Sequence, residues 1–553
     1  MFKTALISSL EKCFIDQRVE DFRPLSALSV LQNERFSVQF IHRGEREVPV
    51  RLMYLVRVDG ALAPYATLRT VESVPVSIPT APDCDDGNYL RTEPGLYPDL
   101  LQPIHYGGAI SIMREALHSV WIEFDLNGQV APGTYPTTVT LCEGNGNVVR
   151  EERVDVTVIG ATLPAQTMRL TQWFHCDCLA NYYRIPAWSE EHWRIVENFA
   201  ATARKNGINL LLTPVFTPAL DTAPGGERTT VQLVDVYKDG DTSTYTFGFD
   251  RLDRWIEMCD RVGIEYLEIA HLFTQWGAEH APKVMGYEGG VYKKLFGWET
   301  EATGDAYRTF LRAFLSAFLA HMKARGDDQR CYFHISDEPQ ESQLESYKAA
   351  KAVVADLLEG YPVMDALSNF EFFRQGIVPM PIPSNDHIEP FIEAGVEGLW
   401  TYYCCGQLKG VSNRMMAMPL WRTRSIGYQF YKYDIAGFLQ WGYNFYNTCG
   451  SIDPINPYLD ACGEYWVPGG DTYSVYPGPD GEALESIRIL AFYEALQDVR
   501  AMKLAEQFYG KDAVVAALEE IVGEIRFDRC ATDADTILRM REKINQMIAE
   551  AIR

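Results

Sequence analysis

The chain has 553 residues, of which 47% are hydrophobic and 23% are charged, and its net charge is −25 with an isoelectric point near 4.9. This length predicts two or three domains. The acidic balance argues against nucleic acid or an anionic membrane surface as a partner, because both require a basic protein surface. We therefore expect a globular protein whose ligand is small or neutral.

Residues 1–162 are expected to form an N-terminal β-sandwich domain. Runs rich in β-forming residues lie at 35–43, 47–58, 118–126, 135–141 and 151–160, and Gly, Pro, Asn and Asp separate them. No long helical pattern interrupts these runs after the first thirty residues. The pattern is typical of two packed sheets with long connections.

From about residue 165, apolar runs alternate with amphipathic helical stretches. The alternation of eight strands with helices predicts a (β/α)8 TIM barrel over residues 163–510. A doubly wound open sheet is the alternative, but no G-x-G-x-x-G motif follows the first strand. The predicted strands are 168–176, 208–216, 264–273, 331–339, 362–368, 378–384, 398–405 and 437–446, and the predicted helices are 189–206, 250–262, 303–325, 341–358, 386–394, 419–433 and 482–508.

Two insertions and a C-terminal extension complete the predicted organisation. Residues 230–249 are expected to form a hairpin after the second strand, and residues 278–304 form a further insertion after the third. Residues 511–553 are expected to be amphipathic helices packed on the barrel. The fold class is therefore a multidomain one, all-β followed by α/β.

The sequence also predicts a cytoplasmic location. The first 22 residues carry Glu11, Asp16 and Glu20 and lack the apolar core of a signal peptide, and no run has the length of a membrane span. The twelve cysteines are spaced irregularly, which favours reduced thiols. The sequence leaves the oligomeric state open.

A TIM barrel places its site at the carboxyl ends of the strands, and this rule selects residues before any motif is considered. Carboxylates, amides and imidazoles lie there among Trp and Tyr. Aromatic rings stack on sugar faces and polar groups bind hydroxyls, so this mixture is typical of a carbohydrate site. The residues expected to bind substrate are Trp173, His175, Asp177, His271, Gln275, Trp276, His334, Asn369, Tyr402, Tyr403, Trp441, Asn444 and Tyr446.

The adjacent acids Asp337 and Glu338 are the expected catalytic residues. They end the predicted fourth strand, and Pro339 predicts an extended or polyproline conformation for Glu338. Crowded carboxylates raise one of their two pKa values, which leaves one group protonated and one ionised, as glycoside hydrolysis requires. The alternative is that Glu338 interacts with the start of the following helix in an ordinary strand-to-helix turn.

Neither a metal nor another cofactor is expected. His175, Asp177, His271, His334 and Asp337 offer nitrogen and oxygen ligands at strand ends. However, the His-x-Asp spacing on the first strand matches no strong metal signature. An isolated histidine on a strand is more often hydrogen-bonded within the protein.

Several stretches resemble glycoside hydrolase family 123 and the related domain of unknown function 4091. They are "TQWFHCDCLA", "LLTPVFTPALDT", "AHLFTQWGA", "FHISDEP", "DALSN", "LWTYYCC" and "GFLQWGYNFY", and "LYPDLLQP" and "VWIEFDLNGQVAPGTY" resemble the β-sandwich that precedes the barrel in that family. The resemblance implies a β-N-acetylgalactosaminidase that works without metal by substrate-assisted retention. It also implies that Asp337 orients the 2-acetamido group and that Glu338 is the general acid and base. Tyr402, Tyr403 or Trp441 would then contact the acetamido methyl group.

The function predicted from the sequence is that of a retaining exo-glycosidase acting on β-linked N-acetylhexosaminides, with N-acetylgalactosamine as the favoured sugar and a short oligosaccharide or glycoside as the substrate. Two alternatives stay open. One is a glycosidase that uses the same two acids on a different sugar. The other is a carbohydrate-binding protein without catalytic activity.

Overall fold

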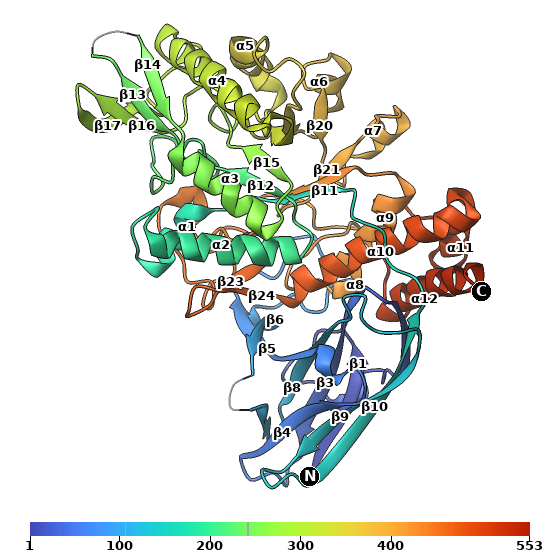
Figure 1. Cartoon of the computed structure of the whole chain (residues 1–553). Coiled ribbons are helices and arrows are strands. Elements are labelled where there is room, and N and C mark those ends of the chain that lie inside the picture. The colour runs from blue at the N-terminus through green and yellow to red at the C-terminus, as the bar shows by residue number, and fades with distance from the viewer. Residues whose placement is uncertain (105–106, 241–242) are drawn as a thin grey trace.

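The computed structural model describes residues 1–104, 107–240 and 243–553. An all-β region forms the lower part of the molecule in Figure 1, and a larger region of mixed strands and helices lies above it. The mixed α/β composition and the N-terminal all-β region that the sequence predicts are thus both confirmed.

The all-β region contains two five-stranded sheets, with strand orders β1-β3-β8-β5-β6 and β2-β10-β9-β4-β7. Phe40 and Val120 from the first sheet and Val156 from the second belong to one buried core. The sequence analysis did not predict five of the strands, namely β1, β2, β5, β6 and β7. Strand β6 contains two prolines, which normally argue against a strand. The bounds are β1 (Phe2–Ser8), β2 (Ala27–Leu31), β3 (Arg35–Gly44), β4 (Arg51–Asp59), β5 (Ala66–Val76), β6 (Gly95–Pro103), β7 (Ala109–Met113), β8 (Leu117–Asp125), β9 (Gly133–Cys142) and β10 (Val148–Ile159).

Short parallel strands form a curled sheet in the mixed region. Ladders join β12-β15-β18, β19-β20 and β11-β22-β21, and single parallel bridges join Phe333 to Val363 and Ser384 to Tyr402. The strands are β11 (Arg169–Gln172), β12 (Leu210–Thr213), β15 (Tyr266–Ile269), β18 (Cys331–Tyr332), β19 (Met364–Ala366), β20 (Met380–Ile382), β21 (Trp400–Tyr402) and β22 (Gly437–Gln440). Each lies within a predicted run and is shorter than it.

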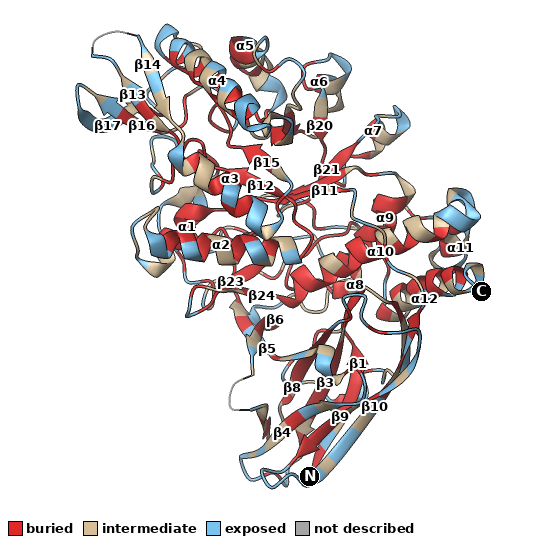
Figure 2. Ribbon diagram, in the orientation of Figure 1, coloured by how far each residue is buried: buried red, intermediate tan, exposed pale blue. Residues whose placement is uncertain are grey.

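Helices alternate with these strands, as the periodicity predicts. Helix α2 begins after Ser189, whose side chain accepts a hydrogen bond from the His192 N–H, and α3 ends at Gly263, which has a φ of 83°. The strands are mostly buried, whereas helices such as α3 and α4 expose one face (Figure 2). The helices are α1 (Cys176–Tyr183), α2 (Glu190–Lys205), α3 (Asp250–Val262), α4 (Asp305–Arg325), α5 (Leu344–Val354), α6 (Phe370–Arg374), α7 (Glu389–Glu393), α8 (Leu420–Arg424), α9 (Ile426–Lys432) and α10 (Ile487–Tyr509).

The two insertions combine into one four-stranded sheet, which projects at the upper left of Figure 1. Its strands are β13 (Asp235–Lys238), β14 (Tyr245–Gly248), β16 (Val284–Glu288) and β17 (Val291–Phe296). The antiparallel pairing of β13 with β14 confirms the predicted hairpin, of which residues 241–242 lie outside the described part of the chain. A second short hairpin, β23 (Val475–Pro477) with β24 (Ala483–Glu485), precedes α10.

The C-terminal residues form α11 (Lys511–Val522) and α12 (Ala534–Ala551), as predicted. Arg541 of α12 bonds with Asp498 of α10 at 2.9 Å and with Glu34, in the turn between β2 and β3, at 2.7 Å. These contacts join the last helix to both regions of the chain. Among the described residues, no helix combines the length and the apolar character needed to cross a membrane. The division of the chain at residues 162 and 510 stays a prediction.

Candidate active site

The adjacent acids Asp337 and Glu338 lie between β18 and α5, and both are partly buried. Glu338 has a φ of 40°, so its backbone is left-handed and not extended. The extended conformation predicted from Pro339 is therefore wrong, because tertiary contacts outweigh the local preference. A left-handed residue interrupts the alternation of side chains along a strand, so neighbouring acids need not face apart.

The two acids have different surroundings. The Tyr402 hydroxyl donates a hydrogen bond to Glu338 Oε1 at 2.6 Å. The Asp337 carbonyl accepts from the Trp276 N–H at 3.0 Å, but its carboxylate receives no hydrogen bond from the described residues. Burial raises the pKa of Asp337 well above its ordinary value, and the charges of Glu338 and Asp221 raise it further. One acid is thus held by a partner, while the other favours its protonated form in the free protein.

Asp365, at the centre of β19, fixes the segment on both sides of the acid pair. Its Oδ1 atom accepts from the Ile335 N–H at 3.1 Å and from His334 Nδ1 at 3.2 Å. Its Oδ2 atom accepts from the hydroxyl of Tyr347 in α5. Because Ile335 precedes the acid pair and Tyr347 follows it, one buried carboxylate holds both ends of the turn.

Glu268 of β15 completes this buried network. It accepts hydrogen bonds from His334 Nε2 at 2.7 Å, from Trp173 Nε1 at 2.8 Å and from the Thr171 hydroxyl. Burial lowers the pKa of His334, but the hydrogen bonds with Asp365 and Glu268 outweigh it and raise this pKa to about 9. His334 is therefore an imidazolium held between two buried carboxylates, and the network joins residues in or just after β11, β15, β18 and β19.

His271 packs against this network. Its ring lies 4.2 Å from that of His334 at an angle of 17°, and both of its buried nitrogens lack a hydrogen-bond partner among the described residues. Ligand atoms of His271, His334 and Asp365 lie within 4.8 Å of one another. However, both nitrogens of His334 already bind carboxylates, and nearly parallel stacked rings do not direct their lone pairs to a common point. These residues therefore fit a metal ion poorly, and we derive no step through one.

His175 and Asp177 anchor a loop that follows β12. Both are buried, and the guanidinium of Arg228 bonds with the Asp177 carboxylate at 2.6 and 2.8 Å and with His175 Nδ1 at 3.0 Å. Burial and the nearby Arg228 charge together lower the pKa of His175 to about 3. The neutral ring can therefore accept the guanidinium hydrogen bond. Contact of either residue with a ligand stays a prediction.

Trp441 is partly exposed, and a buried carboxylate orients its ring. Asp471 accepts hydrogen bonds from Trp441 Nε1 and from the Cys405 N–H, each at 3.0 Å. Burial raises the pKa of Asp471 to about 6, although the Arg414 charge opposes this rise. Asp471 thus connects the segments that follow β21 and β22.

The other predicted residues lie around this centre. Trp276 has 45% of its surface exposed, Asn369 is partly exposed and caps α6, and Gln275 is buried beside the loop after β12. Asn444 and Tyr446 are buried and bond to backbone atoms of His175 and Val475, and Tyr403 packs on Phe438. A cavity of about 390 Å³ lies elsewhere, between residues 164–168 and α10, before β11 begins.

Residues 173–505 match the model of the glycoside hydrolase 123 catalytic domain. This match covers more than half of the chain. The chain belongs to glycoside hydrolase family 123. Comparison of the sequence with curated proteins gives no match.

One solved structure supports the fold of this family 123 protein. A family 123 glycoside hydrolase from Clostridium perfringens, described in a study of glycolipid glycan hydrolysis, is 13% identical and has a TM-score of 0.74; the match covers 99% of this chain and 98% of that one. A β-glucuronidase from Parabacteroides merdae is 10% identical with a TM-score of 0.31 (90% and 51% covered). An endo-β-1,4-mannanase from Thermotoga petrophila is 12% identical with a TM-score of 0.33 (62% and 78% covered).

The sequence analysis missed several polar residues of this candidate site. Asp221 lies eight residues past the end of β12, in a stretch that the sequence resemblance includes, and the strand-end rule indicates that region. Arg228 and Asp471 lie in long connections, where no local pattern marks them. Glu268 lies inside a predicted strand. A charged residue in such an apolar run is a weak signal of a buried polar network.

Proposed function

We propose that this family 123 glycoside hydrolase is a retaining exo-glycosidase that hydrolyses β-linked N-acetylhexosaminides, with β-N-acetylgalactosaminides as its favoured substrates. The observation that carries the proposal is the unequal acid pair after β18. The Glu338 carboxylate is oriented by Tyr402, whereas the Asp337 carboxylate is partly buried and receives no hydrogen bond from the described residues. The hydrolysis of glycolipid glycans described for the Clostridium perfringens enzyme agrees with a glycan substrate.

Substrate-assisted catalysis gives each acid its own task. The acetamido N–H of the sugar donates a hydrogen bond to Asp337, which favours the ionised form of Asp337 and leaves the proton of the pair on Glu338. The acetamido oxygen then attacks C1 and forms a bond to it. The bond between C1 and the glycosidic oxygen breaks, and Glu338 gives its proton to the departing oxygen.

In the second step, water attacks C1 from the face that the leaving group vacated. Glu338 takes a proton from this water, and the bond between C1 and the acetamido oxygen breaks. The two inversions retain the anomeric configuration. Tyr402 orients Glu338 in both steps, and the partly exposed ring of Trp441 supplies an apolar surface for the acetamido methyl group.

Aryl glycosides test the substrate. We expect turnover of aryl β-N-acetylgalactosaminide, and tight binding of a thiazoline that mimics the cyclised acetamido group. No turnover of this glycoside, together with rapid hydrolysis of aryl β-galactoside, would refute the requirement for the acetamido group.

Leaving groups of different acidity test the role of Glu338. Glu338→Gln removes the general acid, whose contribution is about 10²–10⁴-fold. We expect this loss with a poor leaving group such as an alkyl alcohol, and a much smaller loss with dinitrophenol. Equal losses with both substrates would show that Glu338 does not protonate the leaving oxygen.

Three further proposals concern the fold and location. We infer that the curled sheet is a (β/α)8 barrel, supported by the hydrogen bond of 3.1 Å from the Asn209 N–H beside β12 to the Leu170 carbonyl of β11. We infer domains at residues 1–162, 163–510 and 511–553. The cytoplasmic location stays a proposal from the sequence.

A further inference from the structure

The loop after β12 holds Asp221 in a fixed backbone conformation at the edge of the acid pair. Asp221 has a φ of 45°, its N–H donates to Gln275 Oε1, and its carbonyl accepts from the Ser451 hydroxyl at 2.7 Å. Gln275 follows β15 and Ser451 follows β22. The loops of three strands therefore meet at this residue and fix its position.

The same contacts place Asp221 next to the catalytic acids. Gln275 binds the backbone of Asp221, and the following residue, Trp276, donates its N–H to the carbonyl of Asp337 at 3.0 Å. Two successive residues of one loop thus hold the two aspartates. The charges of Asp221 and Asp337 are also close enough to interact.

The carboxylate of Asp221 has no hydrogen bond or ion pair within residues 1–104, 107–240 and 243–553. The nearest cation of its own loop, Arg228, binds the Asp177 carboxylate at 2.6 and 2.8 Å and the Leu220 carbonyl at 3.0 Å. Arg228 thus fixes the residue before Asp221 and leaves the Asp221 side chain unpaired. The part of the chain that the structure describes therefore supplies no donor to this fixed, partly buried acceptor.

The charges and the burial around Asp221 disfavour its ionised form. The pKa of Asp221 is raised to about 7, mainly by burial; the Arg228 charge opposes this rise, whereas the charges of Glu338 and Asp471 add to it. Asp221 in turn raises the pKa of Asp337 and that of the Cys449 thiol. A partly buried carboxylate among like charges is unfavourable unless a ligand supplies donors, and sugar hydroxyls are such donors.

We propose that Asp221 is a specificity-determining residue that accepts hydrogen bonds from one or two hydroxyl groups of the sugar whose glycosidic bond is cleaved. The inference rests on the proposed function, since it requires a glycan at the acid pair. Neighbouring hydroxyls of a sugar ring can bind the two carboxylate oxygens together, so the contact distinguishes sugars by the positions of their hydroxyls.

Asp221→Asn tests this contact, because it keeps the shape of the side chain and removes its charge and one acceptor. The substrate is whichever of four aryl β-glycosides (N-acetylgalactosaminide, N-acetylglucosaminide, galactoside, glucoside) the wild type hydrolyses fastest. We expect kcat/KM to fall about 10- to 100-fold, the range for a hydrogen bond to a charged group. For the deoxy analogue that lacks the bound hydroxyl, the kcat/KM values of wild type and variant should differ less than threefold. This is roughly the deviation from additivity of two changes that do not interact.

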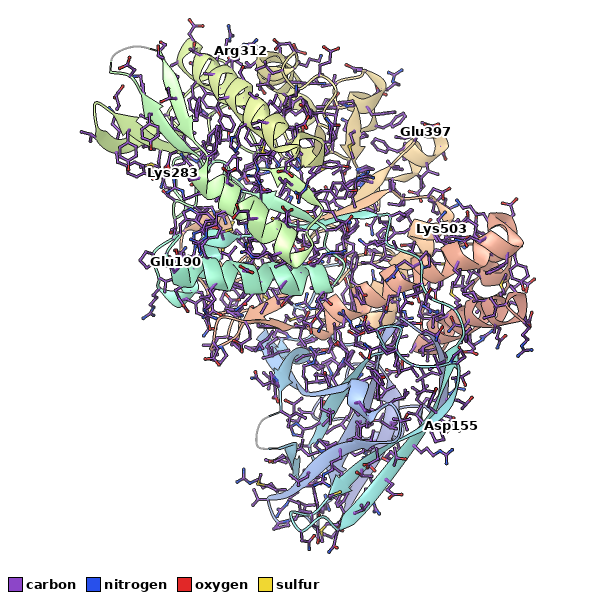
Figure 3. The ribbon with its side chains drawn as sticks, in the orientation of Figure 1. Asp155, Glu190, Lys283, Arg312, Glu397 and Lys503 are labelled. Atoms are coloured by element: carbon purple, nitrogen blue, oxygen red, sulfur yellow. The ribbon has the colours of Figure 1, made fainter. Side chains whose placement is uncertain are left out.

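The control is Glu227→Gln, six residues further along the same loop. Glu227 binds Lys283 and Lys294 at 2.8 Å each, and Lys283, labelled in Figure 3, lies beside the insertion sheet. This variant removes one negative charge at a half-exposed position, and its kcat/KM should equal that of the wild type. Thermal unfolding of both variants checks that they fold.

The pH profile adds a readout that a purely structural residue would not change. The Asp221 charge helps to raise the pKa of Asp337, so Asp221→Asn lowers that pKa and moves the alkaline limb of kcat/KM toward lower pH. Turnover that is unaffected by Asp221→Asn, or equal losses for the parent glycoside and all of its 3-, 4- and 6-deoxy analogues, would overturn this inference alone. No turnover of any of the four glycosides by the wild type would refute the proposed function and the inference with it.

Discussion

A buried ion pair connects the all-β region with the mixed region, and its loss should destabilise the whole protein. Asp99 of β6 accepts from Arg488 Nε at 2.6 Å and from a second guanidinium nitrogen at 2.9 Å, and the Tyr476 hydroxyl donates to it at 2.6 Å. Neither charged side chain is exposed. Arg488 also donates to the carbonyls of Gly470 and Tyr473, on either side of Asp471. The pair therefore supports the residue that orients Trp441.

The expected cost follows from this burial. Asp99→Leu leaves a guanidinium buried without its carboxylate, which costs about 3–5 kcal/mol. Replacing both partners in the double variant Asp99→Leu/Arg488→Met removes the charge as well, so it should cost less than the sum of the single variants. For 553 residues that unfold together, the entropy of unfolding is about 1.2 kcal/mol per kelvin, so the single variant should melt about 3–4 °C lower.

The assay is thermal unfolding of the wild type, both single variants and the double variant, followed by circular dichroism and by residual activity. Surface substitution Arg308→Gln serves as the control, because Arg308 is exposed and its nearest acid, Asp305, lies 3.9 Å away. Additive losses in the double variant, or a single-variant shift below about 1 °C, would refute the reasoning that the buried pair acts as a unit.

Three further predictions concern the candidate active site. His334→Asn should lower the free energy of unfolding most below about pH 6.5. Because the pKa of His334 in the folded protein is about 9, this loss should shrink as the pH rises through 9. Urea unfolding between pH 6 and 10 measures the loss, and a loss that stays constant would contradict the buried imidazolium. Tyr402→Phe should lower kcat/KM about 10-fold or more without changing the melting temperature, and an unchanged rate would mean that its bond to Glu338 has no role in catalysis. The pKa of Asp471 is raised to about 6, and Asp471 binds Trp441. The tryptophan fluorescence of the wild type should therefore change between pH 5 and 7. If Asp471→Asn shows the same change, another titrating group causes it.

The repeating patterns of the chain were sufficient to predict where the strands of the curled sheet lie. Alternating apolar runs and amphipathic stretches identified each strand of the curled sheet and most of the helices, because periodicity reports which face of an element is buried. The strand lengths were overestimated. The run at 331–339 contains a strand of only two residues. Phe333 still forms a single bridge to Val363, but the Ile335 N–H bonds to the Asp365 side chain, so the strand pairing does not continue.

The sequence by itself determined the mixed α/β composition with an N-terminal all-β region, the family and the presence of an acid pair after the fourth strand of the sheet. Only the tertiary structure decided how that pair is arranged. The left-handed backbone of Glu338 contradicts the local preference before proline, and it persists because contacts from other strands hold both ends of the segment. Likewise, Asp221 comes to the acid pair through Gln275, 54 residues further along the chain. Contacts between residues so far apart leave no periodic signal, so the residues that tune a site are the ones that sequence patterns miss.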